Sequence, residues 1–436
     1  MSERGETGGG LGSRQAAVSI LSQVLRRKRP LDMAAAEVFA TANLEPRDQA
    51  FARAIASTSM RRFGQLEALI RAFVPKAPPP HKAGPTLEIL LAGSAELLFL
   101  RVPAHAAVDG ANRLAHADSK AVHFRPLINA VLRRVAQEGP ATLQQQDAAR
   151  LNTPDWLFER WCATYGEDSA RRIAHAQLEI PPLDLTFKSA NDPYTDFRDA
   201  IPLGPGRLRL RDAGKVESLP GFSDGCWWVQ DFAASLPAIL LGDVRGKTVI
   251  DLCAAPGGKT LQLAARGAHV TAVDTAADRL ALVEANLNRM HLSAEMVATD
   301  ARDWKPASES PFVLLDAPCL ATGTIRRHPD LPWIKTAADL VNAESLQSEL
   351  IDAAGAMTAR GGTLVYAVCS LEVEEGEEQV EAFLARRKDF VRSEILPEDV
   401  DKAFITEKGD LRTLPFYWTE KGGMDGFYAA RLKRLL

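Results

Sequence analysis

The chain has 436 residues, of which 46% are hydrophobic and 25% are charged, and its formal net charge is −4. This composition is typical of a globular protein, and the length predicts two or three domains. No apolar run approaches the roughly 20 residues of a membrane-spanning helix, and the polar first residues lack a secretory apolar core, so we expect a cytoplasmic protein without a membrane partner. The five cysteines form no Cys-x-x-Cys pair, which argues against a disulfide framework and predicts no metal site.

Residues 13–138 carry apolar residues at three- and four-residue spacing, which predicts helices throughout this part of the chain. The clearest helical segments are residues 16–25, 48–58, 66–73, 87–100 and 122–136. We therefore expect an all-α bundle that forms a first domain over residues 13–140.

Basic residues cluster on this predicted bundle. Arginine and lysine fill positions 26–29, and two arginine pairs stand at Arg61 with Arg62 and at Arg133 with Arg134. Because the net charge is negative, any contact with nucleic-acid phosphates must depend on such local patches. Solvated helix faces explain each of these pairs about equally well.

The next part of the chain, residues 141–222, predicts a small α/β domain. Residues 139–151 are a polar connector, residues 153–157 begin a further pair of helices, and residues 183–187 have the pattern of a short strand. The remainder, residues 223–436, begins with a helix near 230–235 and then alternates strands with helices. That alternation predicts a parallel sheet covered on both faces.

Residues 248–266 have the pattern of a buried strand, a glycine-rich turn and the start of a helix. Glycines at 257 and 258 allow a ligand to approach the backbone, and the first turn of a helix offers unpaired N–H groups. The turn therefore predicts a nucleotide-type site. Its spacing fits neither a P-loop, which would need a glycine at Cys253, nor the three spaced glycines of a dinucleotide fingerprint.

A second predicted strand, residues 269–274, ends in Asp274. A carboxylate at this place can accept hydrogen bonds from the two hydroxyls of a ribose. Together with the turn, it predicts a nucleoside ligand without a pyrophosphate.

Three further predicted strands end at or near residues with a carboxylate or thiol side chain. Asp300 ends the strand that begins at 294, Asp316 and Cys319 follow the strand that begins at 312, and Cys369 ends the strand that begins at 362. Ligands of open α/β sheets bind at the carboxyl ends of the strands, so we expect these side chains over one crevice. A single cysteine at a strand end is usually a small buried hydrophobe, but two of them favour covalent catalysis.

On these motifs the chain resembles the RNA cytosine-5 methyltransferases, a family of S-adenosylmethionine-dependent, Rossmann-like enzymes. The family's Asp-x-Cys-Ala-Ala-Pro-Gly-Gly-Lys-Thr signature runs from Asp251 to Thr260, and its Pro-Cys and Cys-Ser motifs stand at Cys319 and Cys369. The helical segment resembles the NusB-like domain of one bacterial branch, through Asn129-Ala-Val-Leu-Arg-Arg134. The implied fold class is multidomain: an all-α NusB-like bundle, then an α/β Rossmann-like methyltransferase domain with a small α/β insertion before it.

The resemblance also implies which residues act. Cys369 would add to the base, Cys319 would assist release of the enzyme, and Asp316 would bond the edge of the base. S-adenosylmethionine would be the cofactor, and its implied contacts are Cys253, Ala254, Ala255, Pro256, Gly257, Gly258, Lys259, Asp274, Arg279, Asp300 and Asp316. The implied RNA contacts are Arg133, Arg134, Arg326, Arg327 and His328.

Methylation of carbon 5 of a cytosine requires a nucleophile such as a thiol. Carbon 5 of cytosine is too weak a nucleophile to take a methyl group directly, whereas addition of a thiolate to carbon 6 makes the ring reactive. The sequence departs from the family pattern at three places: Thr186-Phe-Lys188 replaces an Arg-Val-Asn-like triplet, Leu320-Ala321 replaces Ser-Gly, and Glu374-Glu-Gly-Glu377 replaces Glu-Asn-Glu.

We expect a methyltransferase that modifies carbon 5 of a cytosine in RNA, with 16S ribosomal RNA as the partner implied by the NusB-like domain, and a monomer. A transfer-RNA methyltransferase of the same chemistry is the alternative enzyme. A catalytically silent RNA-binding or ribosome-assembly factor is the alternative of another class, and retention of both cysteines argues against it. A DNA methyltransferase would use the Pro-Cys thiol as nucleophile and would not need Cys369.

Overall fold

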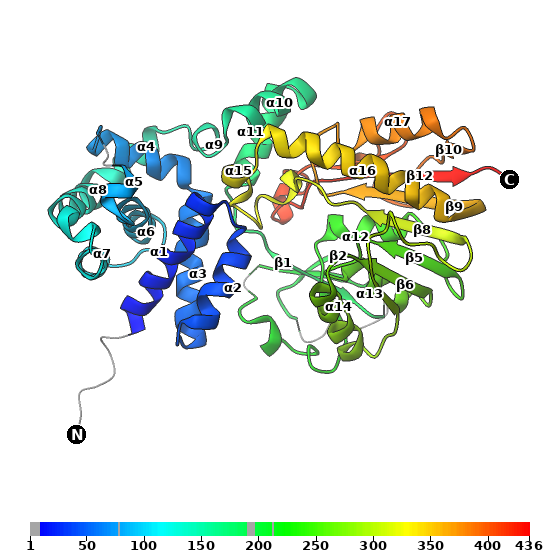
Figure 1. Cartoon of the computed structure of the whole chain (residues 1–436), viewed down its shortest axis with the longest axis horizontal. Coiled ribbons are helices and arrows are strands. Elements are labelled where there is room, and N and C mark those ends of the chain that lie inside the picture. Colours follow the sequence, from blue (N-terminus) through cyan, green and yellow to red (C-terminus); the bar gives the residue numbers. More distant parts are fainter. Residues whose placement is uncertain (1–8, 77–78, 190–196, 212) are drawn as a thin grey trace. The chain divides into compact units, whose positions relative to one another are not determined.

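The computed structural model describes residues 9–76, 79–189, 197–211 and 213–436 (Figure 1). The chain packs into two compact units. The first contains the described residues up to Glu179 together with Ile325–Thr336, and the second contains Ile180–Thr324 and Ala337–Leu436. None of the helices in the described part of the chain is long and apolar enough to cross a membrane.

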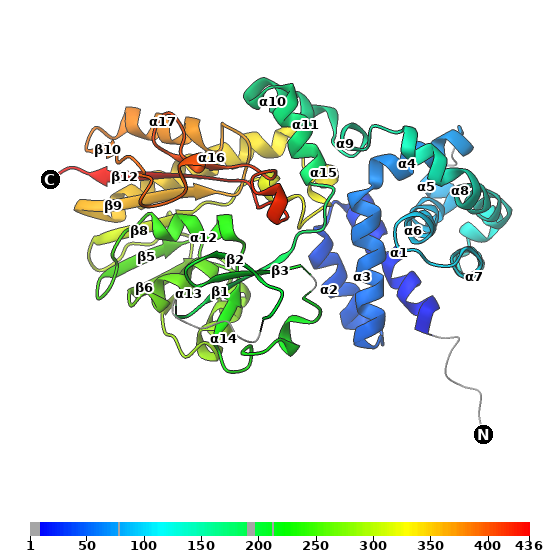
Figure 2. The same ribbon diagram turned by 180° about the vertical axis from the view of Figure 1, so that it is seen from behind.

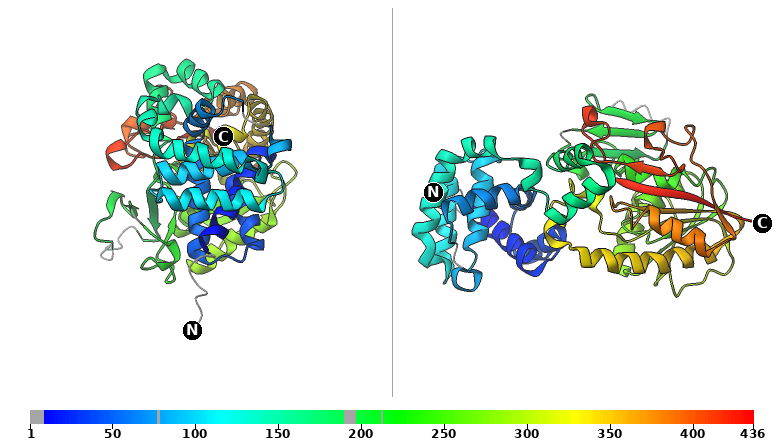
Figure 3. Two further views of the ribbon diagram at one scale, coloured as in Figure 1. Left: turned by 90° about the vertical axis from the view of Figure 1, so that its left-hand side faces the viewer. Right: turned by 90° about the horizontal axis from the view of Figure 1, so that it is seen from above.

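The first unit is all-helical, as predicted (Figure 3). Its helices are α1 (Gly9–Arg27), α2 (Leu31–Thr41), α3 (Pro46–Arg61), α4 (Phe63–Phe73), α5 (Pro80–Ala83), α6 (Thr86–Leu98), α7 (Ala104–Ala117), the short 3-10 helix η1 (Ala121–Phe124), α8 (Arg125–Gln145), α9 (Ala148–Leu151), α10 (Asp155–Tyr165) and α11 (Glu167–Ala176). Their apolar faces close around α1 and α6, whose buried residues include Ile20, Val24 and Leu91. The amphipathic spacing of the sequence is therefore what builds this core.

One detail of the first unit differs from the sequence prediction. Helix α8 continues through Pro140 to Gln145, although the sequence predicts a connector from 139. A proline inside a helix removes one backbone hydrogen bond, and here Gly139 is buried against Leu98 of α6, so packing holds the helix together. Helices α9 to α11 also pack in this unit, which takes in the described residues up to Glu179. The domain bounds 13–140, 141–222 and 223–436 stay predictions.

A segment from the middle of the other unit completes the first core. Residues 325–336 contain the short helix α15 (Leu331–Ile334), and Leu331, Trp333 and Ile334 pack in the apolar core of the bundle. The backbone N–H of Leu31 donates to Oδ2 of Asp330 at 2.9 Å, and Nε1 of Trp333 donates to the carbonyl of Met60 at 3.1 Å. The segment is thus a structural part of the helical unit.

The second unit is built on an eight-stranded sheet with the order β10-β12-β9-β8-β5-β6-β7, in which β11 pairs with β12. The strands β5 to β9 pair in parallel, and β10, β11 and β12 are antiparallel to their neighbours. The bounds are β5 (Thr248–Leu252), β6 (His269–Asp274), β7 (Glu295–Ala298), β8 (Ser310–Asp316), β9 (Thr358–Val368), β10 (Phe390–Arg392), β11 (Leu411–Thr413) and β12 (Phe427–Arg434).

Helices cover both faces of this sheet, because side chains alternate along each strand. On β9, Val365 and Ala367 pack in one apolar cluster, which includes α12 and α13, whereas Leu364 and Tyr366 pack in another, which includes α16 and α17 (Figure 1). The helices are α12 (Phe232–Ile239), α13 (Gly258–Ala265), α14 (Ala277–Arg289), α16 (Ala337–Met357) and α17 (Glu377–Arg386), with short 3-10 helices η2 (Val216–Ser218), η3 (Thr322–Thr324), η4 (Lys402–Phe404) and η5 (Thr419–Lys421).

A small antiparallel sheet precedes the large one, with the strand order β2-β3-β1-β4 (Figure 2). Its strands are β1 (Leu183–Phe187), β2 (Ile201–Gly204), β3 (Arg207–Leu210) and β4 (Trp227–Val229). A buried ion pair fastens it to the rest of the unit: Arg209, which is 0% exposed, donates from Nε to Asp184 at 2.6 Å and from Nη1 to the carbonyl of Gly423 at 2.5 Å. Asp184 in turn accepts from the N–H of Phe232, at the start of α12.

Replacement of Arg209 by methionine should leave Asp184 buried without its cation, so we expect the free energy of unfolding of the second unit to fall by about 3–5 kcal/mol. The exposed Arg211 lies two residues away, and Arg211→Met is the matched control, with an expected change within about 0.5 kcal/mol. Urea unfolding followed by tryptophan fluorescence measures both. Equal losses in the two variants would contradict a dominant role for the buried pair.

Candidate active site

The side chains that the sequence singles out lie at the carboxyl ends of parallel strands. In the sheet order β9-β8-β5-β6, Leu252 pairs with Val273, Leu252 also pairs with Leu315, and Asp316 pairs with Ala367. The residues that follow these strands therefore emerge at one edge of the sheet. Because β6 and β8 lie on opposite sides of β5, this edge is also the point where the strand order reverses, which is where open α/β sheets bind ligands.

The turn between β5 and α13 has the backbone that a close ligand contact needs. Cys253 has a φ of 58° and Gly257 has a φ of 99°, so the chain reverses within a few residues. A Cβ at Gly257 would lie 2.7 Å from Cγ1 of Val283 in α14, which excludes any larger residue there. Burial raises the pKa of the Cys253 thiol to about 12, so this cysteine remains a neutral thiol in the turn.

Asp274 is 5% exposed and braces the turn from the end of β6. Its Oδ2 accepts from the backbone N–H of Ala255 at 3.1 Å, and its Oδ1 accepts from the N–H of Ala276 at 3.1 Å. Arg279 of α14 donates from Nη2 to the carbonyl of Ala255 at 2.6 Å. The predicted cofactor residues Ala255, Asp274 and Arg279 are thus brought together by direct hydrogen bonds.

Asp251 is a buried acid whose contacts the sequence did not foresee. It is 0% exposed, its Oδ2 accepts from the Thr260 hydroxyl at 2.6 Å, and its Oδ1 is buried with no hydrogen-bond partner. Burial raises the pKa of this carboxyl to about 7. The bond between Asp251 and Thr260 ties the end of β5 to the first turn of α13, which fixes the shape of the turn between them.

Asp300 lies two residues beyond the end of β7. Its carboxylate accepts from the backbone N–H of Arg302 at 2.9 Å and from Nη2 of Arg302 at 2.7 Å. The hydrogen bonds from Arg302 lower the pKa of Asp300, so it is an ionised acceptor at neutral pH. The carboxylate of Asp300 thus binds a residue of its own loop, whereas that of Asp274 binds the β5–α13 turn.

Lys259 and Asp316 form an ion pair from two different elements. Nζ of Lys259, in the first turn of α13, lies 2.7 Å from Oδ2 of Asp316 at the end of β8. Burial by itself would lower the pKa of Lys259, but the charge of Asp316 and its hydrogen bond outweigh burial and raise it. The ammonium is therefore a fixed positive charge, and it also lies 5.1 Å from the ring centre of Phe427.

The two cysteines meet. Cys319 follows β8, Cys369 follows β9, and their Sγ atoms lie 3.5 Å apart. The hydrogen bond to Cys369 and burial raise the pKa of the Cys319 thiol well above its usual range, and the nearby Glu375 carboxylate adds to this effect. Cys319 therefore keeps its proton, and it can donate that proton to a thiolate at Cys369.

Polar groups behind the thiols form a continuous network. The Thr322 hydroxyl lies 3.2 Å from that of Ser370 and accepts from the N–H of Leu371, and the N–H of Gly323 donates to the carbonyl of Cys369 at 3.0 Å. A Cβ at Gly323 would lie 2.0 Å from the carbonyl oxygen of Gly426, so only glycine fits. These contacts lock the segment after Cys319 against the segment that carries Cys369.

Glu375 belongs to the same network and was not predicted as a site residue. Its Oε1 accepts from the N–H of Leu320 and from Nε2 of Gln347, each at 2.9 Å. Burial raises the pKa of this carboxyl, and Oε2 has no hydrogen-bond partner. The sequence offered one signal, the acidic run from 374 to 378, but such runs usually mark solvent-exposed turns.

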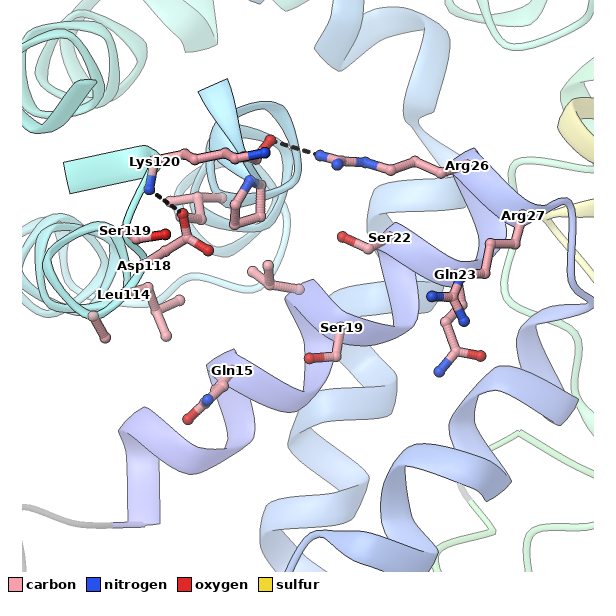
Figure 4. A pocket seen from close by; sticks show the side chains of 15 residues that line it. Gln15, Ser19, Ser22, Gln23, Arg26, Arg27, Leu114, Asp118, Ser119 and Lys120 are labelled. Atoms are coloured by element: carbon pink, nitrogen blue, oxygen red, sulfur yellow. Dashed lines mark hydrogen bonds between the residues drawn. The ribbon is translucent and has the colours of Figure 1, made fainter. Parts of the chain in front are cut away.

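The predicted RNA contacts of the bundle occupy different surroundings. Arg134 on α8 donates to Glu138 at 2.9 Å and lies 4.1 Å from the ring centre of Phe73. Arg133 lines a cavity of about 510 Å³ between α7 and α8, together with His105, Asp109 and Asn129. A second cavity of about 620 Å³ is lined by the polar face of α1 and by residues 117–120 (Figure 4).

The figure also shows how the first basic cluster is used. Arg26 lies at the edge of this second cavity and donates to the carbonyl of Gly84 at 2.7 Å, and its Nε lies 2.6 Å from Glu88 (Figure 4). Arg61 donates to three backbone carbonyls, those of Gln177, Glu179 and Arg326, so its guanidinium serves the bundle itself.

The three basic residues predicted after the Pro-Cys motif lie in the segment that completes the helical unit. Arg326 is 2% exposed, which leaves no surface of this arginine for an RNA contact in this structure. Arg327 is half-buried, and His328 is exposed, with Nδ1 3.4 Å from Oδ2 of Asp32. The sequence could not reveal this burial, because Arg326 belongs to the unit formed by residues up to Glu179, and its carbonyl accepts from Arg61, 265 positions earlier.

Solved structures share this fold. The crystal structure of PH0851 superposes with a TM-score of 0.78 at 22% identity, over 97% of this chain and 99% of that chain. A methyltransferase homolog protein from Pyrococcus horikoshii gives a TM-score of 0.53 at 26% identity, over 64% of this chain and 94% of that chain.

Sequence comparison is more specific. Residues 12–137 match the NusB family, and residues 238–433 match the family described as 16S rRNA methyltransferase RsmB/F. The chain is 35% identical to ribosomal RNA small subunit methyltransferase B of Pasteurella multocida (strain Pm70), over 98% of this chain and 97% of the relative, and 36% identical to that of Vibrio vulnificus (strain YJ016), over 86% and 91%. The chain therefore belongs to the RsmB/F family and is an RNA cytosine-5 methyltransferase with a NusB-family region at its N-terminal side.

Proposed function

We propose that this enzyme methylates carbon 5 of a cytosine in 16S ribosomal RNA, with S-adenosylmethionine as methyl donor and Cys369 as nucleophile. The observation that carries the proposal is the 3.5 Å approach of the Cys319 and Cys369 Sγ atoms beside the pair formed by Lys259 and Asp316. Two thiols and a carboxylate at one sheet edge are what covalent activation of a pyrimidine needs. The curated relatives named above support the choice of RNA.

The residues at the ends of β5, β6 and β7 fit S-adenosylmethionine. Small residues from Ala254 to Gly258 leave the backbone open to an adenosine, and the acid at Asp274 sits where ribose hydroxyls can donate to it. Asp300, an ionised acceptor, is suited to the adenine amino group. S-adenosylmethionine, when bound, supplies the methyl group as an electrophile.

The reaction begins at Cys369. Its thiolate adds to carbon 6 of the cytosine, a sulfur–carbon bond forms, and the electron pair of the ring double bond moves so that carbon 5 becomes nucleophilic. Cys319 assists at this stage, because its protonated thiol stabilises the thiolate of Cys369 before attack. Carbon 5 then takes the methyl group.

Asp316 and Lys259 hold the base during the addition. The carboxylate of Asp316 can accept from the exocyclic amino group, and the ammonium of Lys259 keeps that carboxylate in place at 2.7 Å. Fixed charges of this kind stabilise charge that develops in a transition state, because they need no rearrangement when the reaction occurs.

Release requires that a base, here water from the solvent, removes the proton on carbon 5 and that the bond between Cys369 and carbon 6 breaks. The electron pair of the carbon–hydrogen bond restores the ring double bond, and Cys369 departs as a thiolate. Cys319 is the thiol placed beside this leaving sulfur, so we assign it to release.

The exposed His328 and the arginines at 133, 134 and 327 stay predicted RNA contacts.

Asp274→Asn tests the cofactor site. The variant keeps an acceptor for the N–H of Ala255 but loses the charge that ribose hydroxyls would meet, so we expect affinity for S-adenosylmethionine to fall about 10- to 150-fold, the equivalent of roughly 1.5–3 kcal/mol. Titration calorimetry measures it. Asp278→Asn, on the exposed side of α14, is the control and should bind normally. Equal affinity in both variants would remove Asp274 from the site.

The target is tested in a strain that lacks the gene. Bisulfite sequencing should show one cytosine of 16S ribosomal RNA that loses protection in this strain and regains it when the wild-type gene is restored, but not when Cys369→Ala is restored. Loss of protection in transfer RNA alone would support the transfer-RNA alternative. No change in any RNA would favour a silent RNA-binding factor.

The two single cysteine variants test the order of events. Cys369→Ala should abolish methylation and form no covalent complex. Cys319→Ala should still attack and transfer the methyl group but stall before release, so that protein and RNA migrate together on a denaturing gel with labelled cofactor. An adduct that survives in Cys369→Ala and disappears in Cys319→Ala would reverse the assignment.

A further inference from the structure

We propose that Glu375 is a positioning residue for release: its buried carboxylate holds the loop from Pro318 to Leu320 so that Cys319 stays against Cys369. The inference rests on the proposed function, in which Cys319 acts after methyl transfer. Glu375 would act indirectly, because its carboxylate accepts hydrogen bonds from Leu320 and Gln347 and not from a cysteine thiol.

Both sides of Cys319 are tied to the same pair of buried side chains. The N–H of Leu320 donates to Oε1 of Glu375 at 2.9 Å, and the carbonyl of Pro318 accepts from Nε2 of Gln347 at 2.9 Å. Nε2 of Gln347 also donates to Oε1 of Glu375 at 2.9 Å. Glu375 and Gln347 are each 0% exposed, so water does not compete for these bonds.

Glu375 is itself anchored to the strand that carries the other thiol. The hydroxyl of Tyr366 on β9 donates to the carbonyl of Glu375 at 2.6 Å, and Tyr366 is fully buried in the core of the sheet. Glu375 therefore links two segments: its carboxylate holds the Cys319 loop, and its backbone carbonyl is bound to β9 three residues before Cys369. A shift of the loop relative to β9 would change the distance between the two sulfurs.

The other parts of the site do not depend on this link. Cys369 follows β9, which pairs with β8 and β12 along its length, and its carbonyl accepts from Gly323. Asp316 is held by Lys259. The hydroxyl of Ser370, next to Cys369, also interacts with the Glu375 carboxylate and lowers its pKa, but Thr322 holds this hydroxyl as well, at 3.2 Å. Loss of the Glu375 carboxylate should therefore chiefly release Cys319, and the variant should behave like Cys319→Ala rather than like a generally damaged enzyme.

A neutral hydrogen-bond acceptor at position 375 should be able to perform the positioning role of the carboxylate. In Glu375→Gln the amide oxygen can accept from Leu320 and Gln347, and the amide nitrogen takes the place of Oε2, which has no partner. Glu375→Ala removes the acceptor. Positioning thus predicts opposite results for two changes at one residue, whereas a requirement for the charge predicts the same loss in both.

The experiment follows methyl transfer in a first turnover and the covalent protein–RNA complex on a denaturing gel, with full-length protein, 16S RNA and labelled S-adenosylmethionine. Glu375→Ala should keep methyl transfer but break down the complex about 100-fold more slowly, the effect expected when a reacting group is displaced by about 1 Å. Glu375→Gln should release RNA as the wild type does. Glu378→Ala, at an exposed position of the same acidic run, is the matched control.

The idea is wrong if Glu375→Ala loses methyl transfer and complex together, or if Glu375→Gln stalls as the alanine variant does. Gln347→Met covers the case in which Glu375→Ala does not fold, because it removes the tie to Pro318 from the other side; normal release in Gln347→Met would overturn the proposal. Cys319→Ala is run in parallel. If it forms no stalled complex, the proposed order of the thiols fails; if it does and Glu375→Ala does not, only the role of Glu375 fails.

Discussion

The parallel pairing of β8 with β9 is the constraint on which the site depends. The register sets Asp316 opposite Ala367, so the chain leaves both strands at the same level. Cys319 follows three residues after Asp316 and Cys369 follows two residues after Ala367, and the two thiols can meet only because these strands run side by side in one direction. Parallel neighbours also require a long crossover, and here the connection from 317 to 357 carries the loop with Cys319, the segment that completes the helical unit, and α16.

Charge is balanced at this edge of the sheet. The acids Asp251, Asp274 and Asp316 lie at the ends of adjacent strands, and like charges brought together in a poorly solvated place raise the free energy of the ionised state. Lys259 offsets this repulsion from within, since it is buried and pairs with Asp316. Asp251, which meets only a hydroxyl, instead has its pKa raised to about 7. A single buried cation therefore allows Asp316 to act as an acceptor beside other carboxylates.

Local patterns were enough to predict much of this molecule. The helices near 16–25 and 48–58, the strand ending at Asp274 and the turn with Gly257 follow from periodicity and backbone freedom, which are properties of neighbouring residues. The positions of Cys319 and Cys369 at strand ends predicted that both lie over one crevice, whereas their separate roles were implied by the family resemblance. The burial of Arg326 and the tie from Glu375 to Leu320 depend on partners far away in the chain, and a basic or acidic run gives no sign of such partners. Pro140 shows the reverse error, because tertiary packing overrides a local helix breaker.

The segment 325–336 belongs to the helical unit in the folded protein, although the residues on both sides of it in the sequence belong to the other unit. Ile334 is buried in the core of the bundle, and Leu331 and Trp333 pack against that core. Such a bundle cannot be exchanged for another by recombination at a single point, since the replacement would also have to accept these three side chains and the carboxylate of Asp330 that holds Leu31. We therefore expect the bundle and the segment 325–336 to be exchangeable only together, because Leu31 of α2 and Met60 of α3 contact a stretch of chain nearly 300 residues away.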